Sequence, residues 1–165
     1  MRVLVDTSIW SLALRRSGSV QNPEAEELKR LIGHHVVEII GPIRQEILSG
    51  VRELGQFEHL ESRLVVFPDL PLQSEDYVTA AKMFNLCRKK GIQGSNTDFL
   101  ICAVAVRRDL AIFTTDGDFR LFAKCLPIVV HEFKTKAKPQ LVPYGPQTRR
   151  RKRRALSAGL SHRST

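Results

Sequence analysis

Short runs of almost uninterrupted apolar residues alternate along this chain with longer segments of helical character. The runs are rich in β-branched residues and occupy residues 3–5, 36–40, 64–67, 110–113 and 128–130. A strand that is apolar on both faces is buried on both faces, which is typical of parallel sheets covered by helices. The alternation therefore predicts an α/β domain built on a parallel sheet.

Four of the intervening segments carry helix signals. Asn22-Pro23 followed by glutamates predicts a helix start. Further helices are predicted from Pro42 to Leu48, with Gly50 as a stop, over 74–90, ahead of Gly91, and from Asp98 to about Arg108, the last capped by Asn96 or Thr97. In the predicted helix that begins at Ser74, apolar residues recur at helical spacing, at Tyr77, Ala81, Phe84 and Cys87.

The net charge of +9 is unevenly distributed. Residues 1–133 contain 16 Lys and Arg and 17 Asp and Glu, a net charge of −1. Residues 134–165 contain ten Lys and Arg, no acid and three prolines. We therefore expect a folded domain over 1–133 and a basic, disordered tail over 134–165. Because the body is near neutral, its bulk charge does not indicate a nucleic-acid partner.

Several classes of protein are excluded by missing patterns. No apolar run approaches the roughly 18 residues of a membrane span, so no membrane partner is expected. The N-terminus lacks a signal-peptide pattern, which favours a cytoplasmic protein. The three cysteines fit neither a disulfide framework nor a zinc site, and Cys87 and Cys102 are expected to be buried. Phosphate-loop, GxGxxG, HExxH and GxSxG motifs are absent.

Five acids lie near the carboxyl ends of predicted strands, where parallel α/β sheets bind ligands. Asp6 follows the first strand, Glu46 lies one turn into the helix after the second, and Asp116 and Asp118 follow the fourth. Asp98 lies in the first turn of a predicted helix. That turn faces the same end of the sheet if the helix leads into the fourth strand. Each acid alone also has an ordinary interpretation, as a turn residue, a solvated residue or a partner of a helix dipole.

Placed together on one rim, these carboxylates repel one another by a few kcal/mol, on the order expected at an effective dielectric near 20. A cation between them removes that cost. Ligands that are all oxygen select a hard ion, Mg²⁺ or Mn²⁺, and such ions serve phosphate chemistry. The pattern indicates hydrolysis of a phosphodiester.

Four segments together carry a family resemblance: VLVDTSIW (3–10), PIRQEILSG (42–50), NTDFLICA (96–103) and TTDGDF (114–119). In this order they resemble the motifs of PIN-domain metal-dependent ribonucleases, most closely the VapC-type toxins of prokaryotic toxin–antitoxin pairs. The resemblance covers residues 1 to about 133. It implies a three-layer α/β/α sandwich with a central, mainly parallel sheet.

The resemblance also implies the functional residues, which are Asp6, Glu46, Asp98, Asp116, Asp118 and Thr114. Mg²⁺ or Mn²⁺ is expected at the first four. Asp118 is expected to assist or to replace Asp116, and Thr114 to orient a metal-bound water or a carboxylate.

An RNA substrate, a small antitoxin protein and a homodimer are the partners that the resemblance implies. Cationic clusters at 15–16, 88–90, 107–108 and 149–154 are candidates for RNA contact, although cations at helix ends also occur as solvated residues. Two other functions remain open, a PIN nuclease of RNA maturation and a non-catalytic RNA-binding module. The intact acids speak against the second.

Overall fold

The computed structural model describes residues 1–14 and 22–133. The predicted tail and the clusters at 15–16 and 149–154 lie outside these residues. Within them the elements are β1 (Val3–Val5), α1 (Thr7–Leu14), α2 (Pro23–Gly33), β2 (Val37–Glu38), α3 (Gly41–Ser49), α4 (Leu54–Leu64), α5 (Ser74–Lys89), α6 (Asn96–Arg107), β3 (Ala111–Phe113), α7 (Asp118–Phe122) and β4 (Val129–Val130).

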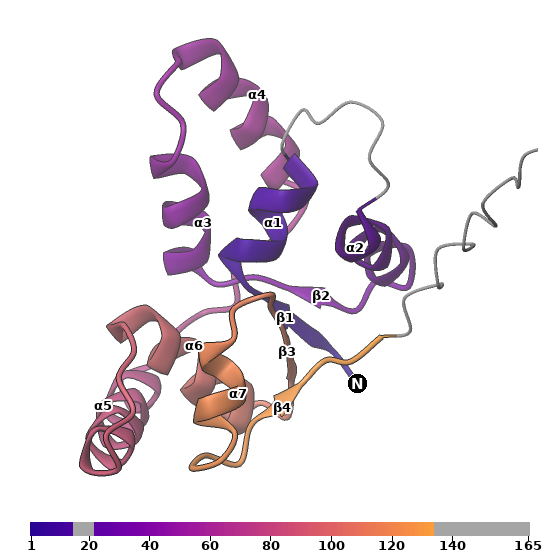
Figure 1. Cartoon of the computed structure of the whole chain (residues 1–165). Coiled ribbons are helices and arrows are strands. Elements are labelled where there is room, and N and C mark those ends of the chain that lie inside the picture. Colours follow the sequence, from indigo (N-terminus) through magenta and orange to yellow (C-terminus); the bar gives the residue numbers. More distant parts are fainter. Residues whose placement is uncertain (15–21, 134–165) are drawn as a thin grey trace, which may run out of the picture.

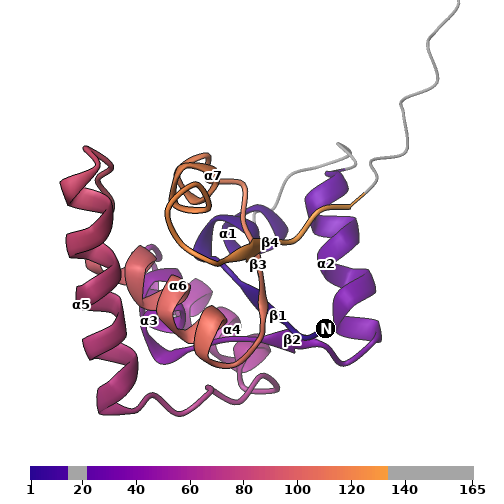
Figure 2. The same ribbon diagram turned by 90° about the horizontal axis from the view of Figure 1, so that it is seen from below.

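The strands form one sheet in the order β2-β1-β3-β4, and every pair is parallel. β1 and β3 are buried along their whole length, and Val5 lies opposite Phe113 at their carboxyl ends. Helices α1 to α4 cover one side of the sheet, and α5 and α6 cover the other (Figures 1 and 2). The predicted three-layer α/β/α fold is confirmed.

The predicted helices form, but α6 begins at Asn96 and is capped by Ser95, not by the predicted Asn96 or Thr97. The Asn22 side chain accepts a hydrogen bond from the backbone N–H of Ala25, 3.0 Å away, ahead of α2. Ser95 and Asp98 exchange hydrogen bonds between side chain and backbone at the start of α6, forming a capping box. Past the end of α5, Gly91 has a φ of +76°, a conformation that favours glycine.

The strand predicted over 64–67 does not form. Leu64 is the last residue of α4, and Val65 and Val66 are 74% and 69% exposed. The guanidinium of Arg44 donates hydrogen bonds to the carbonyls of Leu64 and Phe67. Those carbonyls are therefore satisfied by a side chain and not by a neighbouring strand. Just after this segment, a single parallel β-bridge between Ile39 and Asp69 joins the chain to the edge of the sheet.

Helix α5 buries the predicted face only in part: Cys87 is buried and Phe84 packs against the core, whereas Ala81 is exposed. Its buried residues are Asp76, Ala80, Met83 and Cys87, whereas Tyr77 is 53% exposed. The fully buried Asp76 carboxylate binds the guanidinium groups of Arg107 and Arg108, the latter at 3.0 Å. These two arginines, which were candidates for RNA contact, thus join the end of α6 to the start of α5. Cys87 and Cys102 are buried as predicted.

Candidate active site

The carboxyl ends of β1 and β3 bring Asp6 and Thr114 together. Each residue directly follows its strand, and the Asp6 backbone N–H donates to the carbonyl of Phe113 at 2.9 Å. The Thr114 hydroxyl donates to Oδ2 of Asp6 at 2.8 Å. Asp6 is only 7% exposed, so this contact lies at the base of the site.

Ser8, in the first turn of α1, completes the surroundings of Asp6. Its hydroxyl donates to the same Oδ2 atom at 2.7 Å and accepts the backbone N–H of Thr115 at 3.1 Å. The hydroxyl of Ser8 and the hydroxyl of Thr114 therefore both donate to the same carboxylate oxygen of Asp6. The geometry locks the Asp6 side chain and ties the start of α1 to the chain that follows β3.

Glu46 projects from α3, which follows β2, the strand on the other side of β1. Its Oε2 atom accepts a hydrogen bond from the Thr7 hydroxyl at 2.7 Å. Thr7 is the first residue of α1, adjacent to Asp6 in the chain. A hydroxyl from α1 thus holds Glu46 beside the rim.

Asp98 reaches the rim from the first turn of α6. Its Oδ2 atom accepts the backbone N–H of Ser95 at 2.7 Å. Burial raises the pKa of Asp98, the hydrogen bonds from Ser95 lower it, and the negative charges of Asp6 and Asp116 raise it further, with a net rise. Three carboxylates from distant stretches of chain therefore interact electrostatically at this end of the sheet.

Asp116 is positioned by its own loop. Its backbone N–H donates to the Thr114 hydroxyl at 2.9 Å, and its Oδ1 atom accepts the backbone N–H of Asp118 at 2.9 Å. Asp118 begins α7 and contributes its N–H to this loop. The loop thus directs Asp116 and uses the backbone of Asp118 to do so.

The four acids share one pattern of hydrogen bonding. In each, a single oxygen is held by a neighbouring hydroxyl or N–H: Oδ2 of Asp6, Oε2 of Glu46, Oδ2 of Asp98 and Oδ1 of Asp116. The other oxygen of each accepts no hydrogen bond from the described residues. No Lys or Arg side chain of 1–14 or 22–133 forms an ion pair with any of the four.

The donor set suits a hard divalent cation, because the four side chains offer only carboxylate oxygens and include no thiolate or imidazole. Across the described ranges, no group of three or more Asp, Glu, His or Cys side chains is already gathered closely enough to hold a metal ion. Each of the four carboxylates is therefore held at one oxygen, and the described side chains are not gathered as closely as the ligands of a single ion.

Two residues of this arrangement were not predicted as site residues, Thr7 and Ser8. Both belong to the VLVDTSIW segment, and two hydroxyl residues directly after a strand-end acid were the signal available. Their partners lie 39 and up to 107 positions away in the sequence, so the contacts themselves follow only from the fold.

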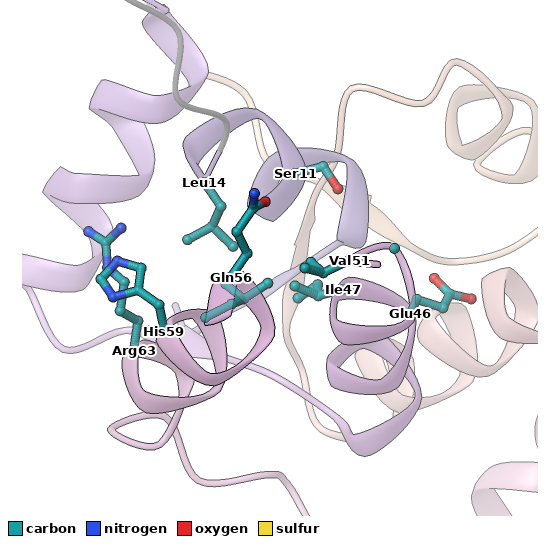
Figure 3. Close-up of a pocket in the computed structure, with 10 residues that line it drawn as sticks. Ser11, Leu14, Glu46, Ile47, Val51, Gln56, His59 and Arg63 are labelled. Atoms are coloured by element: carbon teal, nitrogen blue, oxygen red, sulfur yellow. The ribbon is translucent and has the colours of Figure 1, made fainter. Parts of the chain in front are cut away.

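Two hollows border the acids. One, of about 690 Å³, lies among α1, α3 and α4 and has Glu46 at its edge. The other, of about 740 Å³, is lined by the 114–117 loop with Arg120 and His131. Figure 3 shows the first: Glu46 lies at one end, and His59 and Arg63 of α4 lie at the other. The rim is thus accessible from two directions.

Comparison with known proteins agrees with the motifs. The family model for the PIN domain matches residues 3–124, and this chain belongs to that family. Ribonuclease VapC11 of Mycobacterium tuberculosis is 31% identical over 136 residues, which cover 80% of this chain and 99% of that protein. The predicted family resemblance is confirmed.

Solved structures agree in fold. FitAcB from Neisseria gonorrhoeae matches with a TM-score of 0.65 at 21% identity, covering 79% of this chain and 96% of that one. VapBC2 from Rickettsia felis, solved bound to a DNA fragment from their promoter, matches with a TM-score of 0.65 at 15% identity, covering 81% of this chain and 100% of that one.

None of the helices in the described residues is both long and apolar enough to cross a membrane.

Proposed function

We propose that this protein is a metal-dependent endoribonuclease that hydrolyses RNA phosphodiester bonds, and that it acts in the cytoplasm as the toxin of a type II toxin–antitoxin pair. The observation that carries the proposal is the set of four carboxylates with one oxygen held and one open, three of which interact electrostatically. A protein that only bound RNA would gain nothing from this repulsion. Relatives named as VapC ribonucleases support the same activity.

Mg²⁺ or Mn²⁺ is the proposed cofactor, held by Asp6, Glu46, Asp98 and Asp116. When bound, such ions supply charge for the phosphate and lower the pKa of a bound water. Asp116 is preferred to Asp118 as the fourth acid, because the charge of Asp116 is the one that acts on Asp98, while Asp118 contributes its backbone N–H.

The chain's own hydroxyls do the positioning. Ser8 and Thr114 hold Oδ2 of Asp6, which leaves the other oxygen of Asp6 without a hydrogen-bond partner among the described residues. Thr7 does the same for Glu46. Side chains fixed in this way do not have to be ordered when the substrate phosphate arrives, which lowers the cost of assembling the site.

A small antitoxin is the proposed protein partner. FitAcB and VapBC2 are solved neighbours of the same fold, and open carboxylates without a cationic partner in the described residues suit a basic side chain delivered by another protein. A homodimer is proposed on the family resemblance alone.

The test is cleavage of structured RNAs in Mg²⁺ or Mn²⁺ and in EDTA by the wild type and by Asp6→Asn and Asp98→Asn. Both substitutions preserve size and remove a charge. We expect cleavage only with metal, and a loss of at least tenfold in each variant, since each removes a proposed ligand. Unchanged cleavage in both variants would reject the site. RNA binding without cleavage in any metal would instead favour the non-catalytic module.

Toxicity is tested separately. Expression of the wild type, but not of Asp6→Asn, is expected to arrest growth, and co-expression of the small protein encoded beside it is expected to restore growth. Cleavage without growth arrest would favour a PIN nuclease of RNA maturation.

A further inference from the structure

The hollow beside Asp116, of about 740 Å³, has an excess of negative charge. Glu24 at the start of α2 and Glu132 after β4 line it together with Asp116, and none of these three carboxylates forms an ion pair within the described part of the chain. Among the lining residues, Arg120 of α7 is the single Lys or Arg. The lining therefore has a net charge of −2 when His131 is neutral, which favours a cationic occupant.

The last described residues of the chain lie at the edge of this hollow. Because β3 and β4 are parallel, their carboxyl ends meet at one edge of the sheet, and the residues after β4 lie beside the loop that follows β3. The backbone N–H of His131 donates to the carbonyl of Ile112 at 2.8 Å. Phe133 lines the hollow and packs edge-on against Phe113, with 5.5 Å between the ring centroids. These contacts fix the point from which the rest of the chain continues, on the side of the sheet end that faces α2 (Figures 1 and 2).

The sequence beyond Phe133 has the charge that the hollow lacks. Lys134, Lys136 and Lys138 follow within five residues, and residues 134–165 contain ten Lys and Arg and no acid. A chain extends by at most about 3.5 Å per residue, so Lys138 lies within about 17 Å of Phe133, and the other two lysines lie closer. All three are therefore within reach of the carboxylates that line the hollow.

We propose that Lys134, Lys136 and Lys138 bind back into this hollow of their own chain and there compete with RNA for the acid site. The competition rests on the proposed function, because RNA reaches Asp116 as a substrate, whereas the contact itself does not depend on that function. A short tether gives an effective concentration on the order of mM, which falls roughly as the −3/2 power of the tether's length. The three lysines nearest to Phe133 are therefore favoured over the run from Arg149 to Arg154.

Charge and connection favour this segment over RNA or a separate protein as the occupant. An RNA phosphate adds negative charge to a hollow that already has an excess of it. A separate basic protein loses translational and rotational freedom when it binds, whereas the three lysines are already attached at the edge of the hollow. Because Asp116 belongs both to the hollow and to the acid set, lysines bound there keep substrate away from the acids.

The first test detects the contact without RNA. Full-length protein in EDTA and low salt is treated with a water-soluble carbodiimide, which joins an amine to a carboxylate that it contacts, and the joined peptides are identified by mass spectrometry. We expect Lys136 or Lys138 to be joined to Glu24 or Asp116, and the yield to fall at high salt. An equal mixture of ¹⁵N-labelled and unlabelled protein distinguishes contacts within one chain from contacts between two copies.

The second test measures competition, with a short single-stranded RNA that the wild type cleaves in Mg²⁺. One full-length variant combines Lys134→Gln, Lys136→Gln and Lys138→Gln, and its matched control combines Arg149→Gln, Arg150→Gln and Arg151→Gln, which removes the same charge farther from the hollow. The lysine variant is expected to raise kcat/KM several-fold by lowering KM, with kcat unchanged. In the control, kcat/KM should stay the same or fall.

Unchanged kcat/KM in the lysine variant, with cleavage by the wild type intact, would overturn the competition and leave the nuclease standing. A fall in kcat/KM would overturn it too, by marking the lysines as contacts to RNA. Cross-links that join only labelled to unlabelled chains, or no cross-link to the hollow at all, would overturn the contact within one chain. Cross-links within one chain in a protein that cleaves no RNA would reject the proposed function and confirm the contact.

Discussion

At the scale of single residues, the site depends on hydroxyl groups as much as on acids. Ser8 and Thr114 converge on one oxygen of Asp6, and Thr7 holds one oxygen of Glu46. Each hydrogen bond removes one orientation in which a carboxylate could turn away from the rim. The acids supply charge, and the hydroxyls determine where that charge points.

Thr7→Val tests this division of roles. Valine has nearly the same shape but cannot donate to Glu46, so the Glu46 carboxylate is released. We expect cleavage to fall roughly tenfold, as for loss of a group that orients a metal ligand. The free energy of unfolding should change by no more than about 1 kcal/mol, since one exposed hydrogen bond is lost. Thr7→Ser retains the hydroxyl and is expected to restore cleavage.

Asp98→Asn tests two effects of the Asp98 charge separately, its effect on the stability of the fold and its effect on cleavage. Because the pKa of Asp98 is raised, ionised Asp98 destabilises the fold at pH values above its folded pKa. In EDTA at neutral pH, Asp98→Asn should therefore raise the Tm, although it removes activity. The gain should vanish below the ordinary carboxyl pKa of 3.8, where both side chains are neutral. A Tm that falls at neutral pH would contradict this electrostatic account.

That these acids lie at one end of the sheet could be predicted from their positions after strands and from four motifs in order. Asp116 could not be ranked against Asp118, because the two flank one glycine and only the loop's hydrogen bonds distinguish their orientations. The roles of Thr7 and Ser8 depend on partners far away in the chain, which composition and spacing do not contain.

At the scale of elements, buried strands and capped helices could be predicted because their signals are local. The segment at 64–67 was predicted wrongly because its apolar pattern is that of a strand, whereas the binding of its carbonyls by Arg44 is a tertiary contact. The face that α5 buries was predicted only in part, at Phe84 and Cys87, for a similar reason. A buried carboxylate, Asp76, lies where apolar periodicity alone would place a hydrophobe.

Arg107→Gln is predicted to act on stability and not on RNA. The substitution leaves the fully buried Asp76 with Arg108 as its single cationic partner, so the free energy of unfolding should fall by about 1–3 kcal/mol. RNA affinity in EDTA should match that of the wild type at temperatures where both are folded. Urea unfolding and the binding titration together check this, and weaker RNA binding by a fully folded variant would contradict it.

Glu27 is a second carboxylate, like Asp76, whose cationic partners join two elements; it links α2 to the residue that follows β4. Its carboxylate accepts two hydrogen bonds from Arg30, at 2.7 and 2.8 Å, and lies 2.7 Å from Nε2 of His131, just after β4. The hydrogen bonds from Arg30 outweigh burial and, with His131, lower the pKa of Glu27 from 4.5 to about 2.

Ionised Glu27 therefore stabilises the fold above pH 4.5, and this contribution is lost as the pH falls through about 2. Glu27→Gln should lower the free energy of unfolding by about 1–3 kcal/mol at neutral pH. The difference from the wild type should shrink steadily between pH 4.5 and 2, as measured by urea unfolding at several pH values. A difference that is constant over this range would show that charge is not its source.

At the scale of the whole molecule, the charge is divided between a near-neutral stretch, 1–133, and a strongly basic one, 134–165. Residues 1–133 have a net charge of −1, whereas residues 134–165 have ten cations and no acid. The PIN family match ends at residue 124, before this segment begins. The acid site and the excess of positive over negative charge thus belong to different parts of the chain, and their contributions to RNA binding can be separated experimentally.

A chain that ends at residue 138 lacks seven of these ten cations, including the run from Arg149 to Arg154. If that run contacts single-stranded RNA, each lost phosphate contact should reduce the slope of log affinity against log salt by about 0.7. Because these contacts are non-specific, affinity should fall by a similar factor for unrelated RNA sequences. With saturating RNA, the cleavage rate should stay unchanged, since the four acids and their hydroxyl partners all precede residue 119. Equal salt slopes for the two chains would reject a role for the segment in RNA binding.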